Sequence, residues 1–521
     1  MVIMKKYSFV IQLILILALL PFGSCKKFLD DKPVTSLSTG NAYNTASDME
    51  NALLGCYNSF YSTDYYQWEY VMLSDVRSDN AYPGGNNEET FYDYDRFILP
   101  SSNHHNYVNW GALYYAIARC NILLDKINTV SDAALTDERR KEITGEASFL
   151  RAFHYYQLVK LFGGVPLELE SNTADPSKTR KPRASETEVY NQIVKDLETA
   201  LAALPDSYNG AAGSETENTP SVNKVRATKG AVNAMLAKVW AQRSDRDYSK
   251  VISYCDAVIN STAGYALMGS YTDLFDGDHY LNSESIMEIP FEDGNGAASS
   301  WGIELYLAPE DGWQKYCVPS KDLVAAYDAE GDDIRKNANI VFMTTDANGD
   351  PVSWADENWN PCQDPSVGIP FNYKQKHPAG WASGDHYYLL RLADIILLKA
   401  EAENESGNST AAAALVNTIR ERVSLNPIAT TLSKEEMKTA ILNERRLELA
   451  FEAQRWDDLV RAGVATTVMQ ALNEYSYTCN DGVVSAPQKM DYSNCTQDHW
   501  IMPIPQLEIA ANPSLVQNSG Y

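Results

Sequence analysis

Apolar residues recur at helical spacing along most of this chain, and this periodicity limits the possible folds more than any other feature. Leu113, Ile117, Cys120, Leu124 and Ile127 fall on one face of a helix. Comparable patterns, often two helices joined by a short polar turn, recur near residues 147–161, 186–203, 226–243, 248–260, 387–405, 410–423 and 434–462. The sequence therefore predicts a mostly α-helical fold, a tetratricopeptide-like scaffold of helical pairs, although no repeat consensus is visible.

Two loop-rich regions interrupt this pattern, around residues 57–109 and 262–386. Gly, Pro, Asn, Asp, Trp and Tyr crowd together there, and helical periodicity mostly disappears. Long ordered loops are uncommon unless they serve a function, so we expect the ligand-binding surface in these regions. The predicted organisation is a single domain over residues 25–521, with helical repeats around 105–260 and 387–462.

The first 25 residues are typical of an export signal. Lys5 and Lys6 precede an apolar run, and small residues stand directly before Cys25. The run is shorter than the about 20 residues that a membrane span requires. We therefore expect removal of residues 1–24 as a signal peptide and acylation of Cys25, which would tether the mature chain to a membrane. Plain periplasmic secretion is the alternative, since Phe22 stands where such sites more often have Leu.

The net charge excludes two classes of partner. The chain carries 69 acidic and 43 basic residues, a formal charge of −26. Nucleic acid and anionic lipid headgroups would both repel such a protein. With 45% hydrophobic residues, the chain can still bury a large core.

The cysteines predict at most a few disulfides. Seven remain besides Cys25, so at least one is unpaired. Cys120 and Cys255 fall in helical patterns and are expected to be small core residues. Cys479 and Cys495 bracket a polar loop, which makes them the candidate disulfide of an exported protein. No C-x-x-C pair occurs, so a thiolate zinc site has no support.

Several segments resemble, in order from one end of the chain to the other, those of SusD/RagB proteins. They are residues 25–33 (CKKFLDDKP), 119–124 (RCNILL), 146–156 (EASFLRAFHYY), 161–167 (LFGGVPL), 390–402 (LRLADIILLKAEA), 416–420 (VNTIR), 443–452 (NERRLELAFE), 455–459 (RWDDL), 503–505 (PIP), 512–513 (NP) and 517–521 (QNSGY). The central block resembles the family poorly, and there the ligand preference would be set.

This resemblance implies a SusD-like fold with four tetratricopeptide-like helix pairs. It also implies a lipid anchor that holds the protein at the cell surface, on the outer membrane. The implied function is non-catalytic binding of oligosaccharide or polysaccharide and its delivery to a SusC-like TonB-dependent transporter. No cofactor is implied.

Aromatic residues of the two loop-rich regions are the candidates for stacking on sugar rings. Sugars present apolar C–H faces to flat rings, and hydroxyl groups to Asn, Asp, Gln or Arg side chains. For any single ring, packing inside the loop is the alternative role, but as a set we expect two or three to line the site. The candidate rings are Tyr65, Tyr66, Trp68 and Tyr82 in the first region and Trp301, Trp313, Trp354, Trp359 and Trp381 in the second.

The segment 74–82 is dense in planar hydrogen-bonding groups. In the family that the chain resembles, residues around this segment contribute to the ligand face. Asp75, Arg77, Asp79 and Asn80 are therefore candidates for contacts with sugar hydroxyls. The alternative is an internal Asp–Arg pair that holds the loop.

The charge-rich stretch 444–458 could be mistaken for a catalytic carboxylate cluster. Opposite charges alternate there at helical spacing and can satisfy one another. Neighbouring arginines lower carboxylate pKa values, whereas a general acid needs a raised pKa. We interpret the stretch as structural.

No other motif indicates an enzyme or a metal site. Asp346, Asn348, Asp350 and Glu357 have the offsets of a calcium loop, but Pro351 replaces the glycine that its turn requires. The same stretch reads equally well as a hairpin turn. The chain contains no H-E-x-x-H, G-x-S-x-G, P-loop or G-x-G-x-x-G sequence.

Two alternatives to glycan binding stay open from the residues alone. A surface glycoside hydrolase would need two carboxylates about 5 to 10 Å apart that face one another in a cleft. A protein-binding helical-repeat scaffold would instead present an apolar concave groove and bury its tryptophans.

Overall fold

The structure is a computed structural model that describes nine stretches of the chain: residues 42–67, 74–84, 89–171, 180–208, 220–292, 317–344, 356, 358–374 and 383–521. Residues Thr45–Tyr521 form one compact unit. The predicted signal peptide and Cys25 lie outside the described residues. Within the described stretches, no helix combines the length and the apolar character needed to span a bilayer.

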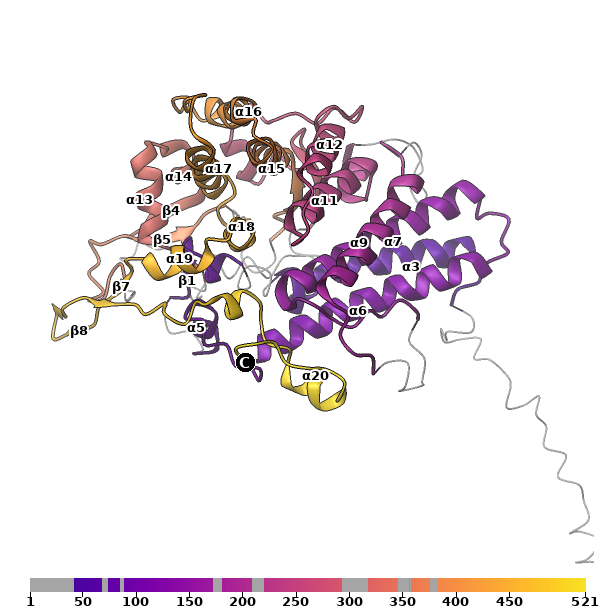
Figure 1. The fold of residues 1–521 in the computed structure, drawn as a ribbon, viewed down its shortest axis with the longest axis horizontal. Helices are drawn as coiled ribbons and strands as arrows, with labels where there is room; N and C mark the ends of the chain where they lie inside the picture. Colours follow the sequence, from indigo (N-terminus) through magenta and orange to yellow (C-terminus); the bar gives the residue numbers. More distant parts are fainter. Residues whose placement is uncertain are drawn as a thin grey trace, which may run out of the picture. The chain divides into compact units, whose positions relative to one another are not determined.

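The N-terminal half of this unit is a layer of long helices (Figure 1). Helix α7 packs between α6 and α9, and α3 packs on both α6 and α7. The predicted stripe on α6 is buried at Leu113, Ile117 and Cys120. The four helices are α3 (Ala46–Tyr57), α6 (His104–Lys126), α7 (Asp137–Phe162) and α9 (Glu186–Ala203).

A second group of helices also packs in neighbouring pairs. Helix α12 contacts both α11 and α15, and α15 packs against α16 and α17. The members are α11 (Lys229–Gln242), α12 (Tyr248–Ile259), α15 (Leu392–Glu405), α16 (Ser409–Arg422), α17 (Lys434–Glu448) and α18 (Arg455–Ala462). The predicted mostly α-helical fold built from helix pairs is confirmed.

Two predicted helices have different bounds. The segment 387–405 begins as strand β6 (Tyr387–Arg391), because these residues pair with β2 (Ser285–Ile289), and the helix starts only at Leu392. The segment 434–462 is divided between α17 and α18, with Phe451 and Ala453 at positive φ in the break. Hydrogen bonds from buried side chains to the backbone stabilise this break between the two helices. Asp75 accepts the Ala453 N–H at 2.7 Å, and the Lys374 ammonium donates to the Ala450 carbonyl at 2.7 Å.

Short elements fill the loop-rich regions and the C-terminal part. Two helices, α13 and α14, interrupt the region expected to be irregular, because Leu323 and Tyr327 supply one buried turn and Ser320 caps it. The remaining elements include α5 (Glu89–Asp95), α10 (Pro220–Val225), α13 (Lys321–Glu330), α14 (Asp333–Asn339), α19 (Ala465–Ala471) and α20 (Gln506–Ala511). The antiparallel strand pairs are β1 (Ala81–Tyr82) with β3 (Val318–Pro319), β4 (Ile340–Met343) with β5 (Ile369–Asn372), β7 (Tyr475–Ser476) with β10 (Gln488–Lys489), and β8 (Cys479–Asn480) with β9 (Val483–Val484).

The disulfide differs from the predicted one. Cys479, on the β8–β9 hairpin, is bonded to Cys362 and not to Cys495. Cys495 is a buried free thiol that packs in a core cluster with Trp456 and Met469. The Cys495 side chain therefore packs in the core and forms no disulfide with Cys479, although the two cysteines bracket a polar loop in the sequence. Cys120 and Cys255 are buried free thiols, as expected.

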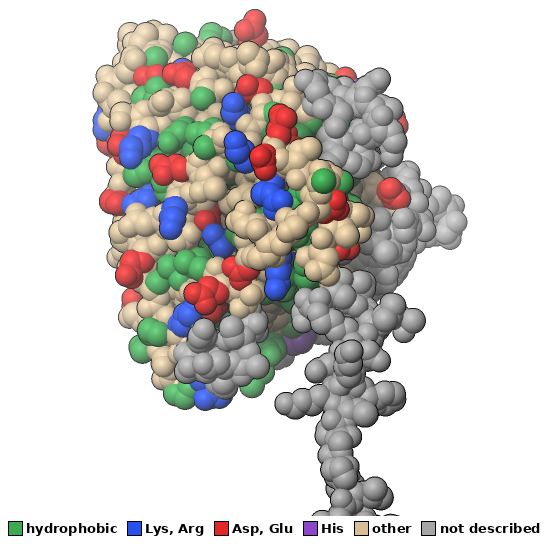
Figure 2. All heavy atoms as spheres, turned by 90° about the vertical axis from the view of Figure 1, so that its right-hand side faces the viewer, with side chains coloured by type: hydrophobic (Ala, Val, Ile, Leu, Met, Phe, Trp, Pro, Cys, Tyr) green, Lys and Arg blue, Asp and Glu red, His purple; other side chains and the backbone are tan. Residues whose placement is uncertain are grey.

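The surface carries charges of both signs. On the face drawn in Figure 2, basic and acidic side chains are interspersed, and hydrophobic side chains appear in small separate groups. The acidic side chains on this face therefore do not form a single patch, although the whole chain has a net charge of −26.

A capping box at the start of α17 gives a local test of these helix assignments. The Ser433 hydroxyl accepts the Glu436 N–H at 3.3 Å, and the Glu436 carboxylate accepts the Ser433 N–H at 2.8 Å. We expect Ser433→Ala to lower the free energy of unfolding by about 1 kcal/mol, because it leaves a helical N–H without its acceptor. Urea unfolding measures this change. Thr431→Ala, at an exposed position two residues earlier, should stay within about 0.5 kcal/mol of the parent; equal losses in both variants would contradict the capping role.

Candidate functional site

The two loop-rich regions meet on one surface, which we call the loop junction: residues 78–84, 317–321, 356 and 358–372. Strand β1 from the first region pairs with β3 from the second. The Ser320 hydroxyl donates to the Asp79 carbonyl at 2.7 Å, and the Tyr82 hydroxyl donates to the Asp356 carboxylate at 2.7 Å. Segments more than 200 residues apart therefore form a single unit, as a shared binding surface requires.

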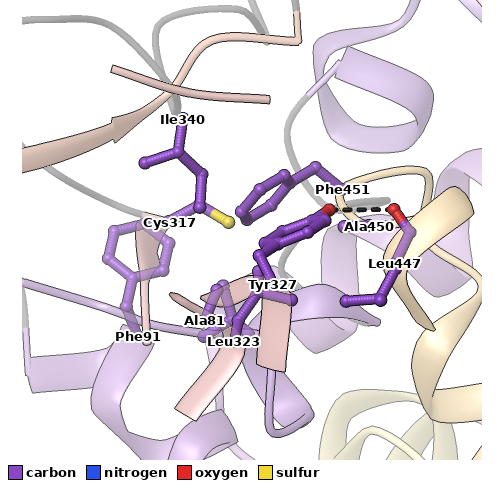
Figure 3. Close-up of a cluster of buried hydrophobic side chains, with 10 residues drawn as sticks. Ala81, Phe91, Cys317, Leu323, Tyr327, Ile340, Leu447, Ala450 and Phe451 are labelled. Atoms are coloured by element: carbon purple, nitrogen blue, oxygen red, sulfur yellow. Dashed lines mark hydrogen bonds between the residues drawn. The ribbon is translucent and has the colours of Figure 1, made fainter. Parts of the chain in front are cut away.

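A hydrophobic cluster fixes the loop junction to the helical scaffold (Figure 3). The Tyr327 hydroxyl donates to the carbonyl of Leu447, near the end of α17, at 2.8 Å. The cluster fixes the positions from which the loops extend, and this favours a pre-organised ligand surface. The cluster comprises Val76, Ala81 and Phe91 from the first region, Cys317, Leu323, Tyr327 and Ile340 from the second, and Leu447, Ala450 and Phe451 from α17 and the segment after it.

Partly exposed rings gather at the edge of the loop junction. The Trp359 indole N–H donates to the Pro319 carbonyl at 3.2 Å, and its ring meets the edge of Phe342 at 5.4 Å between centroids. Phe342 is 44% exposed. The Lys321 ammonium lies 5.2 Å from the Trp359 ring centre and 5.3 Å from that of Tyr477. Fixed rings beside a cation can stack on a sugar face while the ammonium donates to a hydroxyl.

The sequence singled out Trp359 in this group but missed Lys321, Phe342 and Tyr477. The disulfide explains why Tyr477 was missed: Cys362–Cys479 links its hairpin to the segment just after Trp359, although the two cysteines are 117 residues apart. The spacing of cysteines along a sequence gives no such connection in advance.

The other predicted rings fall into two sets. Tyr65, Tyr66 and Tyr82 are at most 2% exposed, and the Tyr65 hydroxyl lies 2.9 Å from His154 Nδ1 in a cluster of aromatic rings. For these three, the structure favours the alternative role, packing inside the loop region, because their faces are covered by core residues. Trp68, Trp301, Trp313, Trp354 and Trp381 lie outside the described residues.

The polar segment 74–82 is built into the interior. Asp79 accepts two hydrogen bonds from Arg455, both at 2.7 Å, while Arg446 donates to the Asp79 carbonyl at 2.7 Å and to Asn80 Oδ1 at 2.9 Å. Burial by itself would raise the pKa of Asp79, but Arg446 and Arg455 together lower it to about 2. The Arg77 guanidinium donates to the His499 carbonyl at 2.8 Å.

The internal-pair alternative thus describes this segment, with one difference from its expected form. The arginines that pair with Asp79 come from residues 446 and 455, not from within the segment. The four candidate side chains are each at most 3% exposed, so they support the loop junction from the protein interior: Asp75, Arg77, Asp79 and Asn80.

The buried Asp75 carboxyl group makes the stability of the fold depend on pH. It is fully buried, and burial raises its pKa to about 7 despite the Ala453 N–H and the Lys374 ammonium, which lower it. The folded-state pKa exceeds the ordinary aspartate value of 3.8, so folding favours the protonated form. The resulting stability is present below about pH 4 and is lost as the pH rises through about 7.

We therefore expect Asp75→Asn to gain stability over the parent chain between pH 5 and pH 8. The amide oxygen can still accept the Ala453 N–H, and no charge has to be buried. The gain should be at least about 1.4 kcal/mol, the value of one pKa unit. Urea unfolding at both pH values measures it, with Asp333→Asn at an exposed site as the control. A difference between variant and parent that is the same at pH 5 and pH 8 would refute a buried titrating Asp75.

The charge-rich stretch 444–458 is structural, as predicted. The Glu448 carboxylate binds Arg335, Arg391 and Arg422, and these arginines outweigh the effect of burial and hold its pKa well below the usual range. These arginines come from α14, β6 and α16. Glu448 is therefore neutralised by residues of other elements and not by neighbours on α17. Such a closed network has no carboxyl group suited to act as a general acid.

Metal ligands do not cluster in the described part of the chain: no three His, Cys, Asp or Glu side chains there could hold an ion together. The calcium-loop candidates Asp346, Asn348, Asp350 and Glu357 lie outside it.

Comparison with known proteins decides the family. The sequence model of the SusD family matches residues 283–521, and a second model, described as starch-binding and associating with the outer membrane, matches residues 27–240. The chain belongs to the SusD family. Its relatives include SusD-like protein P2 of Formosa agariphila, 27% identical over 99% of this chain and 100% of that protein. The starch-binding protein SusD of Bacteroides thetaiotaomicron is 25% identical over 81% of this chain and 79% of its own length.

The fold agrees with this membership. A solved structure of a laminarin-binding SusD-like protein superposes with a TM-score of 0.71 and 25% identity, over 92% of this chain and 100% of that one. SusD-family proteins associate with the outer membrane and bind glycans without catalysis, so this chain is a binding protein and not an enzyme.

Proposed function

We propose that this SusD-family protein captures oligosaccharide or polysaccharide at the cell surface and delivers it, uncleaved, to a SusC-like TonB-dependent transporter. The observation that carries the proposal is the loop junction, where both loop-rich regions are anchored by one hydrophobic cluster and the second region presents partly exposed rings. Relatives that bind starch and laminarin support glycan as the cargo.

In this proposal, the ligand rests on rings of the loops that leave the junction. Trp301, Trp313 and Trp354 are the principal candidates, Trp68 is a further one, and Trp359 and Lys321 form the described edge of the site. Few rings contact each glycan, so the affinity for a single chain end should be modest. The glycosidase alternative loses support, because the described cluster of acidic residues is neutralised by arginines.

We also propose that acylated Cys25 anchors the chain in the outer membrane, where it can cover its transporter partner. The Cys25→Ala variant should lose incorporation of labelled fatty acid and leave the membrane fraction. Retention of label in that variant would contradict the anchor. Co-purification of the parent chain with a TonB-dependent barrel from solubilised outer membranes tests the partner, and its absence under mild detergent would contradict it.

A screen of the soluble chain, starting at Lys26, tests capture and catalysis together. We expect retention on a glycan array, and no new reducing ends when the retained glycans are incubated with the protein. Release of reducing sugar would replace capture with hydrolysis, and retention of no glycan would contradict the proposal.

A further inference from the structure

A second pocket opens on the helical layer, and it shares no residue with the loop junction. It lies between α6 and the C-terminal segment that contains α20, which are neighbours in Figure 1. Its volume is about 500 Å³. Pockets for small ligands commonly measure about 300 to 1,000 Å³, so this one is large enough for one or two sugar rings.

Two aromatic rings, one helical turn apart on α6, line this pocket. Trp110 is only 3% exposed and packs edge-on against Phe162, with centroids 4.9 Å apart, so the partly exposed Tyr114 is the ring available for stacking. The Tyr114 hydroxyl donates to the Pro166 carbonyl at 2.9 Å, which fixes that ring as well. Leu515 contributes a further apolar surface. Rings that are already fixed lose little entropy when a ligand stacks on them.

Carboxylates supply most of the charged groups among the described lining residues. Glu168, Glu170 and Glu508 line the pocket, against a single guanidinium, that of Arg180. Glu168 Oε2 pairs with Lys181 at 3.0 Å, but Oε1 is buried without a hydrogen-bond donor in the described chain. A buried acceptor without a donor favours a ligand that brings hydroxyl or amine hydrogens. The excess of carboxylates would repel an anionic sugar.

Gly111 lines the pocket and leaves the space at its Cβ position unfilled. It lies in the interior of the 23-residue helix α6, where glycine costs about 1 kcal/mol relative to alanine. A Cβ at this position would meet no atom within 4 Å, so close packing does not require glycine. A large side chain at this position would therefore occupy space in the pocket.

We propose that this pocket is a second saccharide site, which takes one or two uncharged or amine-bearing sugar rings of a glycan. The assignment rests on the proposed function for its ligand class, and it adds a contact outside the loop junction. Two sites on one chain would raise the avidity for a long glycan over that for a single unit.

The test compares two matched glycine variants. Gly111→Phe fills the pocket mouth, while Gly55→Phe places the same ring on helix α3, where a Cβ also meets no atom within 4 Å. The probes are neutral hexasaccharides of glucose, mannose, galactose and xylose, with hexagalacturonate as the anionic comparison. Hydrogen exchange is followed in peptides that cover residues 506–515.

We expect at least one neutral probe to slow exchange in these peptides in the parent and in Gly55→Phe, and to have no effect on them in Gly111→Phe. Binding at the loop junction, followed as the loss caused by Trp301→Ala, should be the same in both glycine variants. Protection that persists in Gly111→Phe, protection by hexagalacturonate alone, or binding elsewhere without protection here would overturn the second site. Binding of no probe anywhere would overturn the proposed function as well.

Discussion

Replacing Arg391 with alanine is expected to lower the free energy of unfolding by about 3 to 5 kcal/mol, because it removes a buried cation that three buried carboxylates share. The Arg391 guanidinium donates to Glu284 at 2.9 Å, to Glu448 at 2.7 Å and to Glu452 at 2.6 Å. Arg391 is 2% exposed, so water cannot replace it. Its partners lie just before β2, at the end of α17 and in the break before α18.

Equilibrium unfolding in urea measures this effect, with an exposed ion pair as the control. Lys434 pairs with Glu405 at 2.8 Å, and the Lys434 side chain is 46% exposed. Lys434→Ala should cost no more than about 1 kcal/mol, since exposed pairs are weak and screened by salt. A loss in Arg391→Ala no greater than that of the control would show that the buried network does not hold the scaffold together.

Removing both Trp301 and Trp354 is expected to weaken glycan binding at least about tenfold. If each ring stacks on a sugar, its truncation should cost about 1 kcal/mol or more, and 1.4 kcal/mol corresponds to a factor of ten. The measurement is affinity electrophoresis or calorimetry with a glycan retained in the screen.

Trp240→Ala is the matched control, since Trp240 lies on α11, outside both loop-rich regions. It should leave the dissociation constant unchanged. Thermal unfolding of each variant shows whether the loss arises from the ligand contact or from misfolding. Unchanged binding in the folded Trp301→Ala/Trp354→Ala variant would favour a protein-binding scaffold over a glycan receptor.

Helical periodicity predicted the scaffold closely. The segment 186–203 coincides with α9, and 248–260 with α12, because apolar spacing and a capping residue both mark these helices. Periodicity failed where tertiary contacts compete with it. The residues 387–391 continue an apolar pattern, yet pairing with β2 makes them a strand.

The candidate site was less predictable, because residue type does not reveal which rings stay at the surface. Tyr65 and Trp359 are both aromatic residues in loop-rich sequence, yet Tyr65 is enclosed by Phe60 and His154, whereas Trp359 lies at an edge. The sequence also did not reveal which residues pair with the buried charges. Asp79 binds arginines more than 360 residues away, a pairing that only the folded chain creates.

A crystal structure of the chain from Lys26, grown with a hexasaccharide retained in the screen, tests most directly whether the loop junction holds glycan without cleaving it. We expect an intact glycan beside Trp359, with at least one pyranose ring lying flat against a tryptophan of residues 293–316 or 345–355. A glycan that contacts no aromatic side chain of either loop-rich region, or one found cleaved, would contradict this mode of capture.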